Sequence, residues 1–325
     1  MENKCCKIFV ILSLILFFTI PAVCSEKPPD FPKKPIRLIV PYVPASGNDT
    51  QSRGIAVYLE KHLRVRVLIE NRPGADGRIG VNEAWKSSPD GYTLINPGMP
   101  TPILNEKLFP VKYKVQEFTH IFAWSKDNIV VVVNSETWKT PQEFIADAQS
   151  KTLSGGVTGI GSSAMVAGLA LEDTARFKPV NWVPFSGGGE TMTQLAGKHI
   201  DFGITTMASA APLVGAGKLR PLLVYSNEKD HRFPNTPLPR EVGLNLTPIA
   251  VVWGVFAPPG LPQQIANILE QAFFKAVQEP DFLTWAQKLR MEVSLMNRDQ
   301  FFAYTISMEK EIVKHLDKLK RKINQ

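Results

Sequence analysis

"PIRLIVPYVPASGNDTQSRG", residues 35–54, joins a strand pattern to a helix pattern through a short polar turn. The apolar run at 36–40 is typical of a buried strand, and the residues from about 50 to 62 have helical spacing. A helix that begins at such a turn leaves backbone N–H groups unpaired at its positive end. These groups favour carboxylates, phosphates and sulfates. The stretch therefore predicts an α/β fold and an anion-binding turn.

The same alternation continues along the chain, which is typical of α/β domains with parallel sheets. Further strands are expected at 64–71, 91–98, 129–134, 219–226 and 249–260, and three helical stretches close the chain around 262–278, 281–290 and 298–321. Two hydrophobic strands, 129–134 and 250–257, bracket the second set of elements. We expect them to cross between two lobes as a hinge, with a ligand cleft between the lobes. The expected domains are lobe I at 25–127 plus 251–325 and lobe II at 128–250.

The first 24 residues have the pattern of a secretory signal peptide. Lys4 and Lys7 precede an apolar run at 8–20, and the small residues Ala22 and Cys24 suit a cleavage site. We expect cleavage after Cys24 and an exported protein; a lipoprotein acylated on Cys24 is the less favoured alternative. Cleavage removes all three cysteines, so the mature chain would hold no disulfide, thiol nucleophile or thiolate ligand.

Length and charge argue for two domains and against a nucleic-acid partner. A chain of 325 residues exceeds what one core usually organises. The formal charge of +7 falls to +6 on cleavage and is spread diffusely. The one dense basic patch, at 314–325, indicates a solvated helix end. We expect a monomer that binds no nucleic acid.

The sequence gives little support to an enzyme. Its five histidines are scattered, with no pair at metal-ligand spacing, and "GIGSSA" only loosely resembles a nucleophile elbow. Asp49 is expected to cap a helix and Asp201 to begin a strand. We expect no catalytic residue, no metal and no cofactor; a hydrolase or transferase remains the distant alternative.

Four turns rich in Gly, Ser and Thr fall at strand ends, close to helix starts. They are 45–49, 96–98, 159–163 and 185–189. Glycine lets a ligand approach the backbone, and serine adds a hydroxyl donor. Turns from both expected lobes could therefore hold one small anion between them.

Four motifs resemble those of the Bug family, the periplasmic solute-binding proteins of tripartite tricarboxylate transporters. They are "PIRLIVPYVPASGNDTQSR", "VLIENRPGADGRIG", "SPDGYTL" and "GKLRPLLVYS", and the likeness runs from about Lys34 to the C-terminus. The resemblance implies a type II periplasmic-binding architecture in which two α/β lobes close on a small carboxylate. It also implies that backbone N–H groups, hydroxyls and water hold that carboxylate.

The chain departs from the family pattern at several turn positions. Ala45 and Ser46 replace glycines, Met165 replaces a histidine, Phe185 and Ser186 replace tyrosine and lysine, and Thr205-Thr206 replaces Asp-Asn. These changes leave the identity of the ligand open. They disfavour an α-amino acid, because Asp49 is the one acid at these turns that could pair its ammonium.

The sequence thus predicts a non-enzymatic receptor for a di- or tricarboxylate or an aromatic carboxylate. Its membrane partner would be the permease of a tripartite transporter; a sensor protein is the alternative. The predicted ligand-binding residues are Tyr42, Ala45, Ser46, Gly47, Asp49, Asn96, Gly98, Gly161, Ser162, Ser163, Phe185, Ser186, Gly187, Thr205 and Thr206.

Overall fold

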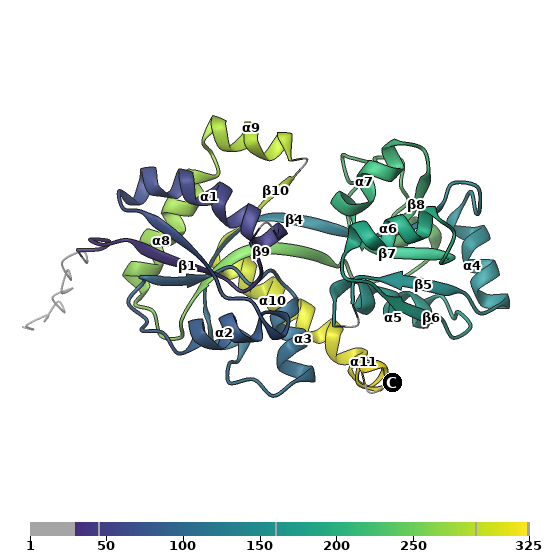
Figure 1. The fold of residues 1–325 in the computed structure, drawn as a ribbon, viewed down its shortest axis with the longest axis horizontal. Helices are drawn as coiled ribbons and strands as arrows, with labels where there is room; N and C mark the ends of the chain where they lie inside the picture. Colours follow the sequence, from purple (N-terminus) through teal and green to yellow (C-terminus); the bar gives the residue numbers. More distant parts are fainter. Residues whose placement is uncertain (1–29, 45, 160, 290, 324–325) are drawn as a thin grey trace, which may run out of the picture.

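A computed structural model describes residues 30–44, 46–159, 161–289 and 291–323. The expected signal peptide and Ala45 lie outside the described residues. Two α/β lobes lie side by side and share one long strand (Figure 1).

Lobe I is built on a sheet in which β1 (Ile36–Val40) pairs in parallel with β2 (Val67–Asn71) and β3 (Thr93–Ile95). β9 (Ala250–Ala257) and β10 (Glu292–Met296) run antiparallel to the first part of β4 (Thr119–Asn134). The helices of this lobe are α1 (Gly47–Leu63), α2 (Arg78–Trp85), α3 (Thr101–Leu108), α8 (Gln263–Ala276), α9 (Pro280–Lys288) and α10 (Arg298–Lys314). Its short 3-10 helices are η1 (Ala75–Gly77) and η2 (Val115–Glu117).

Lobe II repeats the plan around a second sheet. β5 (Ser154–Val157) pairs in parallel with β6 (Asn181–Pro184) and β7 (Phe202–Thr206), while β7 and β8 (Leu219–Val224) pair antiparallel with the end of β4. Its helices are α4 (Pro141–Ser150), α5 (Ser163–Thr174), α6 (Gly188–Ala196), α7 (Met207–Gly215) and the 3-10 helix η3 (Pro239–Val242).

The shared strand β4 connects the two sheets. Residues 119–128 pair with β9, and residues 129–134 pair with β7 and β8. The returning chain crosses beside it, because the Ile129 N–H donates to the Ile249 carbonyl at 3.1 Å. The sequence predicted the strand only at 129–134, since the Ser, Lys, Asp and Asn residues at 125–128 have low strand propensity.

Each sheet is covered by helices that bury apolar side chains. In lobe I, Leu38 and Ile55 belong to one buried cluster with the α8 residue Leu269. In lobe II, Val130 and Val132 of β4 pack with Leu195 and Met207. The apolar second half of β4 is therefore explained by burial within lobe II.

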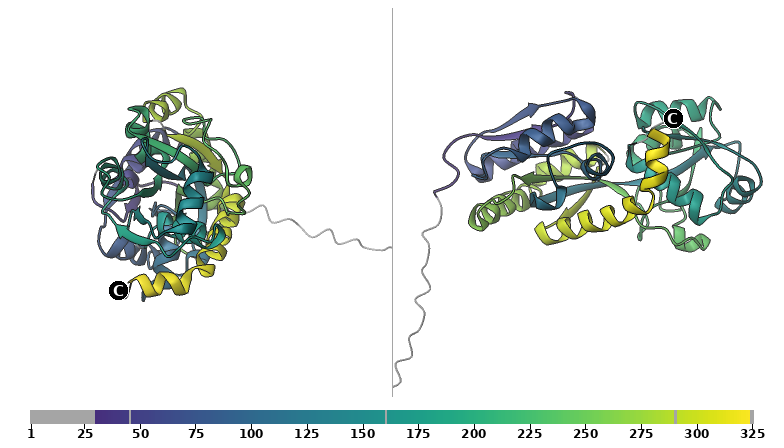
Figure 2. Two further views of the ribbon diagram at one scale, coloured as in Figure 1. Left: turned by 90° about the vertical axis from the view of Figure 1, so that its right-hand side faces the viewer. Right: turned by 90° about the horizontal axis from the view of Figure 1, so that it is seen from below.

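The last helix reaches across the junction of the lobes. The expected helix at 298–321 is divided at His315, so that α11 (Leu316–Ile323) changes direction (Figure 2). Lys318 of α11 pairs with Glu172 and Asp173 of α5, and His315 lies 3.3 Å from Asp173. The C-terminal segment thus contacts lobe II as well as lobe I.

Candidate ligand-binding site

The turn that opens the sequence forms the start of α1. Ser46 is the N-cap, and its hydroxyl accepts a hydrogen bond from the Asp49 N–H at 3.3 Å. The expectation that Asp49 caps this helix is therefore wrong. The buried Asp49 carboxylate instead accepts hydrogen bonds from Arg53 and Asn71, each at 2.9 Å. Asp49 thus fixes the base of the turn, while Gly47 is exposed at its tip.

The turn after β3 packs against the start of α1. Asn48 donates to the Asn96 carbonyl at 3.3 Å, and its own amide oxygen accepts from the Trp253 indole at 3.3 Å. Gly98 has φ +66°, and a Cβ there would lie 2.7 Å from Asn48 Nδ2. Glycine is required at this position, both for its backbone conformation and for this close approach. The buried Asn96 side chain donates to Ser52 of α1 at 2.9 Å, which ties the turn after β3 to that helix.

Tyr42 lies at the same edge of lobe I. Its hydroxyl donates to the Pro97 carbonyl at 3.0 Å. Burial raises the pKa of Tyr42 to about 12, although a hydrogen bond with Thr101 opposes the shift. The phenol is therefore neutral and holds the turns after β1 and β3 together.

Three helices of lobe II begin at the carboxyl edge of its sheet. Ser162 caps α5: its hydroxyl accepts from the Met165 N–H at 3.2 Å and donates to the Gly159 carbonyl at 2.8 Å. Ser163 is buried in the first turn, and Gly161 has open space around it. The Ser162 hydroxyl is therefore already engaged within its own turn.

The turn before α6 is held differently. Both the N–H and the hydroxyl of Ser186 donate to Glu190, and these hydrogen bonds lower the pKa of that carboxyl. Phe185 is half-buried and its N–H donates to the Val157 carbonyl at 2.9 Å. Within the described chain, the N-cap residue Gly187 provides no side-chain cap for α6.

The third helix, α7, holds a carboxylate of the protein itself. Thr206 is its N-cap. Asp127 of β4 accepts hydrogen bonds from the Ala208 N–H at 3.2 and 3.3 Å and from Arg232 at 2.7 Å. Burial raises the pKa of Asp127 and outweighs the opposing effect of Arg232. For Asp230, burial is outweighed by its hydrogen bonds to Arg232, and its pKa is lowered.

A cavity of about 330 Å³ lies between the lobes. It is lined by Gly47, Thr50, Gln51, Ser125, Lys126, Asp127, Thr206, Ala208, Ser209, Arg232, Trp253, Leu289, Met291 and Glu292. Its charged side chains are paired: Lys126 with Glu292 at 3.2 Å, and Arg232 with Asp127 at 2.7 Å. An anion entering this cavity would therefore meet hydroxyls and backbone N–H groups more readily than a free cation.

Two of the predicted ligand-binding residues, Gly47 and Thr206, line this cavity directly. The other described ones lie at strand ends, turns and helix starts at the same carboxyl edges of the two sheets. Sequence reasoning missed Ser125, Trp253 and the pair of Asp127 with Arg232. Ser125 and Trp253 lie within strands, where no local turn signal marks them.

No group of three or more His, Cys, Asp or Glu side chains suited to a metal ion is found in the described part of the chain. A search of the same residues finds no helix that is long and apolar enough to span a membrane.

Two α/β lobes that share crossing strands and enclose a cavity define the type II periplasmic-binding architecture. The chain matches the family model of the tripartite tricarboxylate transporter family receptor, TctC, over residues 52–318. The protein belongs to this family of solute-binding proteins, and the predicted fold class and family are confirmed.

Relatives in the curated sequences support the same family assignment. The chain is 31% identical over 293 residues to the Cupriavidus necator "UPF0065 protein in gbd 5'region", covering 88% of each chain. It is 29% identical to BugT of Bordetella pertussis, over 76% of this chain and 78% of that protein.

Solved structures support the same fold and family assignment. A ligand-free TctC solute-binding protein from Polaromonas matches with a TM-score of 0.78 and 27% identity, over 90% of this chain and 99% of that one. MatC from Rhodopseudomonas palustris, with bound malate, matches with a TM-score of 0.68 and 25% identity, over 90% and 99%.

Proposed function

We propose that this protein captures a small organic carboxylate between its lobes and presents it to the permease of a tripartite tricarboxylate-type transporter. One observation carries the proposal. The N-terminus of α6 has no side-chain cap within the described chain and is flanked by glycines. It lies beside Ser209, which lines an interlobe cavity whose charges are already paired.

The geometry at α6 suits a carboxylate. A Cβ at Gly187 or Gly189 would meet no other atom within 4 Å, so a ligand can approach the backbone there. A Cβ at Gly188 would lie 2.4 Å from the hydroxyls of Thr205 and Ser209, so both hydroxyls lie close to this helix start. The buried Thr205 hydroxyl has no hydrogen-bond partner among the described residues. Helix N–H groups and neighbouring hydroxyls are good donors to a carboxylate.

Lobe I supplies the opposite wall. Gly47 and Trp253 line the cavity, and a Cβ at Gly47 would lie 3.8 Å from the Trp253 ring. We propose that the chain bends at 127–130 and 249–252, so that the start of α1 closes over a ligand held at α6. The lobe boundaries expected from the sequence are part of this proposal. A ligand that contacts both lobes stabilises the closed form, which the permease would recognise.

The ligand class follows from the charges. Asp49 is engaged with Arg53 and Asn71, and Asp127 with Arg232, so these acids are poorly placed to pair a ligand ammonium. A dicarboxylate or an aromatic carboxylate therefore suits the site better than an amino acid. MatC, which binds malate, supports the carboxylate class by similarity.

The location follows from the family. TctC-family proteins are periplasmic, and the N-terminal pattern at 1–24 supports export through a cleaved signal peptide. We propose that the mature protein is a monomer without catalytic activity.

Native mass spectrometry of freshly purified periplasmic protein tests the proposal, because it retains a bound ligand for identification. Calorimetry with malate, adipate, benzoate, aspartate and glucose then ranks the classes. We expect binding by one or more carboxylates without an ammonium group and no turnover of the bound compound. Binding confined to amino acids or sugars, or chemical conversion of the ligand, would overturn the proposal.

A further inference from the structure

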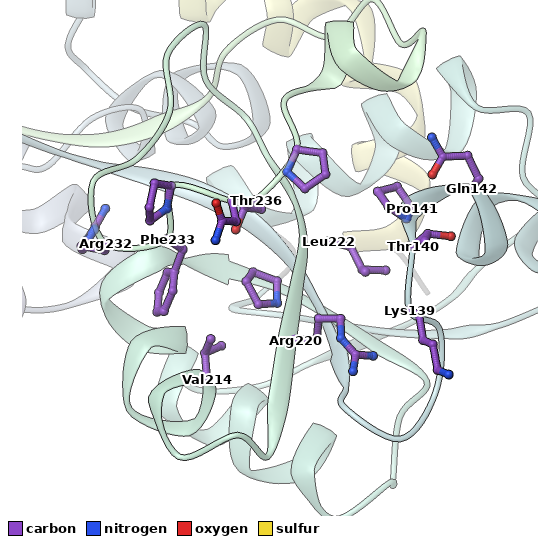
Figure 3. Close-up of a pocket in the computed structure, with 14 residues that line it drawn as sticks. Lys139, Thr140, Pro141, Gln142, Val214, Arg220, Leu222, Arg232, Phe233 and Thr236 are labelled. Atoms are coloured by element: carbon purple, nitrogen blue, oxygen red, sulfur yellow. The ribbon is translucent and has the colours of Figure 1, made fainter.

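A second cavity, of about 560 Å³, lies on lobe II. It is bounded by the start of α4, the end of α7, β8 and the loop at 232–237. Its lining residues are Lys139, Thr140, Pro141, Gln142, Val214, Arg220, Pro221, Leu222, Arg232, Phe233, Pro234, Asn235, Thr236 and Pro237 (Figure 3). It shares only Arg232 with the interlobe cavity, so the two cavities meet at that residue.

The lining is positively charged. It contains Lys139, Arg220 and Arg232 and no Asp or Glu. Arg232 is balanced by Asp127 and Asp230. Lys139 and Arg220 have no ion-pair partner among the described residues. Arg220 donates one hydrogen bond to the Trp138 carbonyl at 2.8 Å, which leaves other N–H donors of its guanidinium available.

Two further polar features lie at this cavity. Thr140 caps α4, and Pro141 occupies its first turn, so the positive end of the helix lies at the cavity wall. Glu143, in the first turn of α4, accepts from the Lys139 N–H at 2.7 Å. The Thr236 hydroxyl is buried and has no hydrogen-bond partner within the described chain. The site therefore offers donors and positive charge without a matching acid in its lining.

Apart from Gln142 and Asn235, the rest of the wall is apolar. Val214, Leu222 and Phe233 contribute side chains, together with four prolines. In Figure 3, Phe233 and Val214 lie on one side of the cavity, while Arg220 and Lys139 extend on the other. A cavity of this size is within the range of about 300–1,000 Å³ typical of small-molecule sites.

We propose that this cavity is a second binding site, for a small anion with an apolar body such as an aryl or alkyl carboxylate. Arg220 and Lys139 hold the anionic group, and Phe233, Val214 and the prolines contact the apolar part. The site is independent of the interlobe cavity, because it is built entirely from lobe II and does not require closure of the lobes.

Fluorine NMR titration with 4-fluorophenylacetate tests the proposal, and the neutral 4-fluorophenylacetamide is the matched probe. Every protein carries Gly187→Asp, which, on the proposed function, weakens carboxylate binding at α6 and so reduces the contribution of the interlobe site to the measurement. Arg220→Gln with Lys139→Gln removes the two cations. Lys151→Gln, at the exposed far end of α4, is the control for loss of a surface lysine outside the cavity lining.

We expect the acid to bind at least about tenfold more tightly than the amide, since a hydrogen bond to a charged group contributes about 1.5–3 kcal/mol. The double variant should weaken binding of the acid about tenfold or more, and Lys151→Gln should change it less than twofold. Equal affinity for acid and amide, equal affinity in the double variant and the control, or no binding to the parent protein would each overturn the proposal.

Discussion

Replacing Gly187 with aspartate should weaken capture of the carboxylate by at least about tenfold without damaging the fold. Gly187 is the N-cap of α6, and its backbone is extended, with φ −175° and ψ 167°. Any residue adopts this conformation, and a Cβ there would meet no other atom within 4 Å. An aspartate at this position would accept hydrogen bonds from the first N–H groups of α6, as N-cap residues do. It would therefore occupy the donors that we assign to the ligand.

The two effects of this substitution have opposite signs. Aspartate is better than glycine at an N-cap by only a few tenths of a kcal/mol, so the melting temperature should stay within about 1–2 °C of the wild type or rise slightly. A lost hydrogen bond to a charged ligand group costs about 1.5–3 kcal/mol, and repulsion between two carboxylates adds to this. Affinity should therefore fall by at least about tenfold, while stability is retained.

Calorimetry with the carboxylate that co-purifies with the protein measures the affinity, and thermal unfolding without ligand measures the stability. Gly189→Ala is the matched control, because its Cβ also meets open space but its backbone N–H remains and no acceptor is added. Wild-type affinity in Gly187→Asp would refute the assignment of α6 as the carboxylate site. A fall in melting temperature of more than about 5 °C would refute the helix-cap argument.

Three further predictions concern stability. Burial lowers the pKa of His120 to about 4, below its unfolded value of 6.5. The protein should therefore lose about 3 kcal/mol of unfolding free energy as the pH falls from 6.5 to 4. Urea unfolding at both pH values should show a smaller loss of unfolding free energy for His120→Gln than for the wild type. Gly98→Ala should destabilise the protein more than Gly260→Ala, by about 1 kcal/mol or more. Both glycines have positive φ, but only a Cβ at position 98 would meet the Asn48 amide. Equal losses of unfolding free energy in urea titrations of the two variants would contradict this. Asp127→Asn should cost about 3 kcal/mol, because it leaves a buried arginine less well paired; a loss below about 1 kcal/mol would show that this pair contributes little.

The turns were predictable from sequence because their signals are local. A strand pattern followed by glycine and serine and then by a helix pattern identified the start of α1 and the turn before α6. The rest of the cavity depends on contacts between distant residues. Asp127 within β4 pairs with Arg232, which is 105 positions away. Trp253 lies within a strand, so only the packed fold reveals that it lines the cavity.

The starts of α6 and α7 differ in how their backbone N–H groups are satisfied, and this difference favours α6 as the anion site that we propose. Both helices begin at the carboxyl edge of the same sheet and lie close together, since a Cβ at Gly188 of α6 would lie 2.4 Å from the hydroxyls of Ser209 in α7 and Thr205 in β7. The start of α7 already holds a carboxylate through a backbone N–H, that of Asp127, and Arg232 neutralises its charge. The start of α6 has the same donors, has no side-chain cap from the described chain and is bordered by glycines that leave room for a ligand. Because α7 is satisfied from within the protein, a second carboxylate entering between the lobes should go to α6, which is why a single acceptor added at Gly187 should be enough to exclude it.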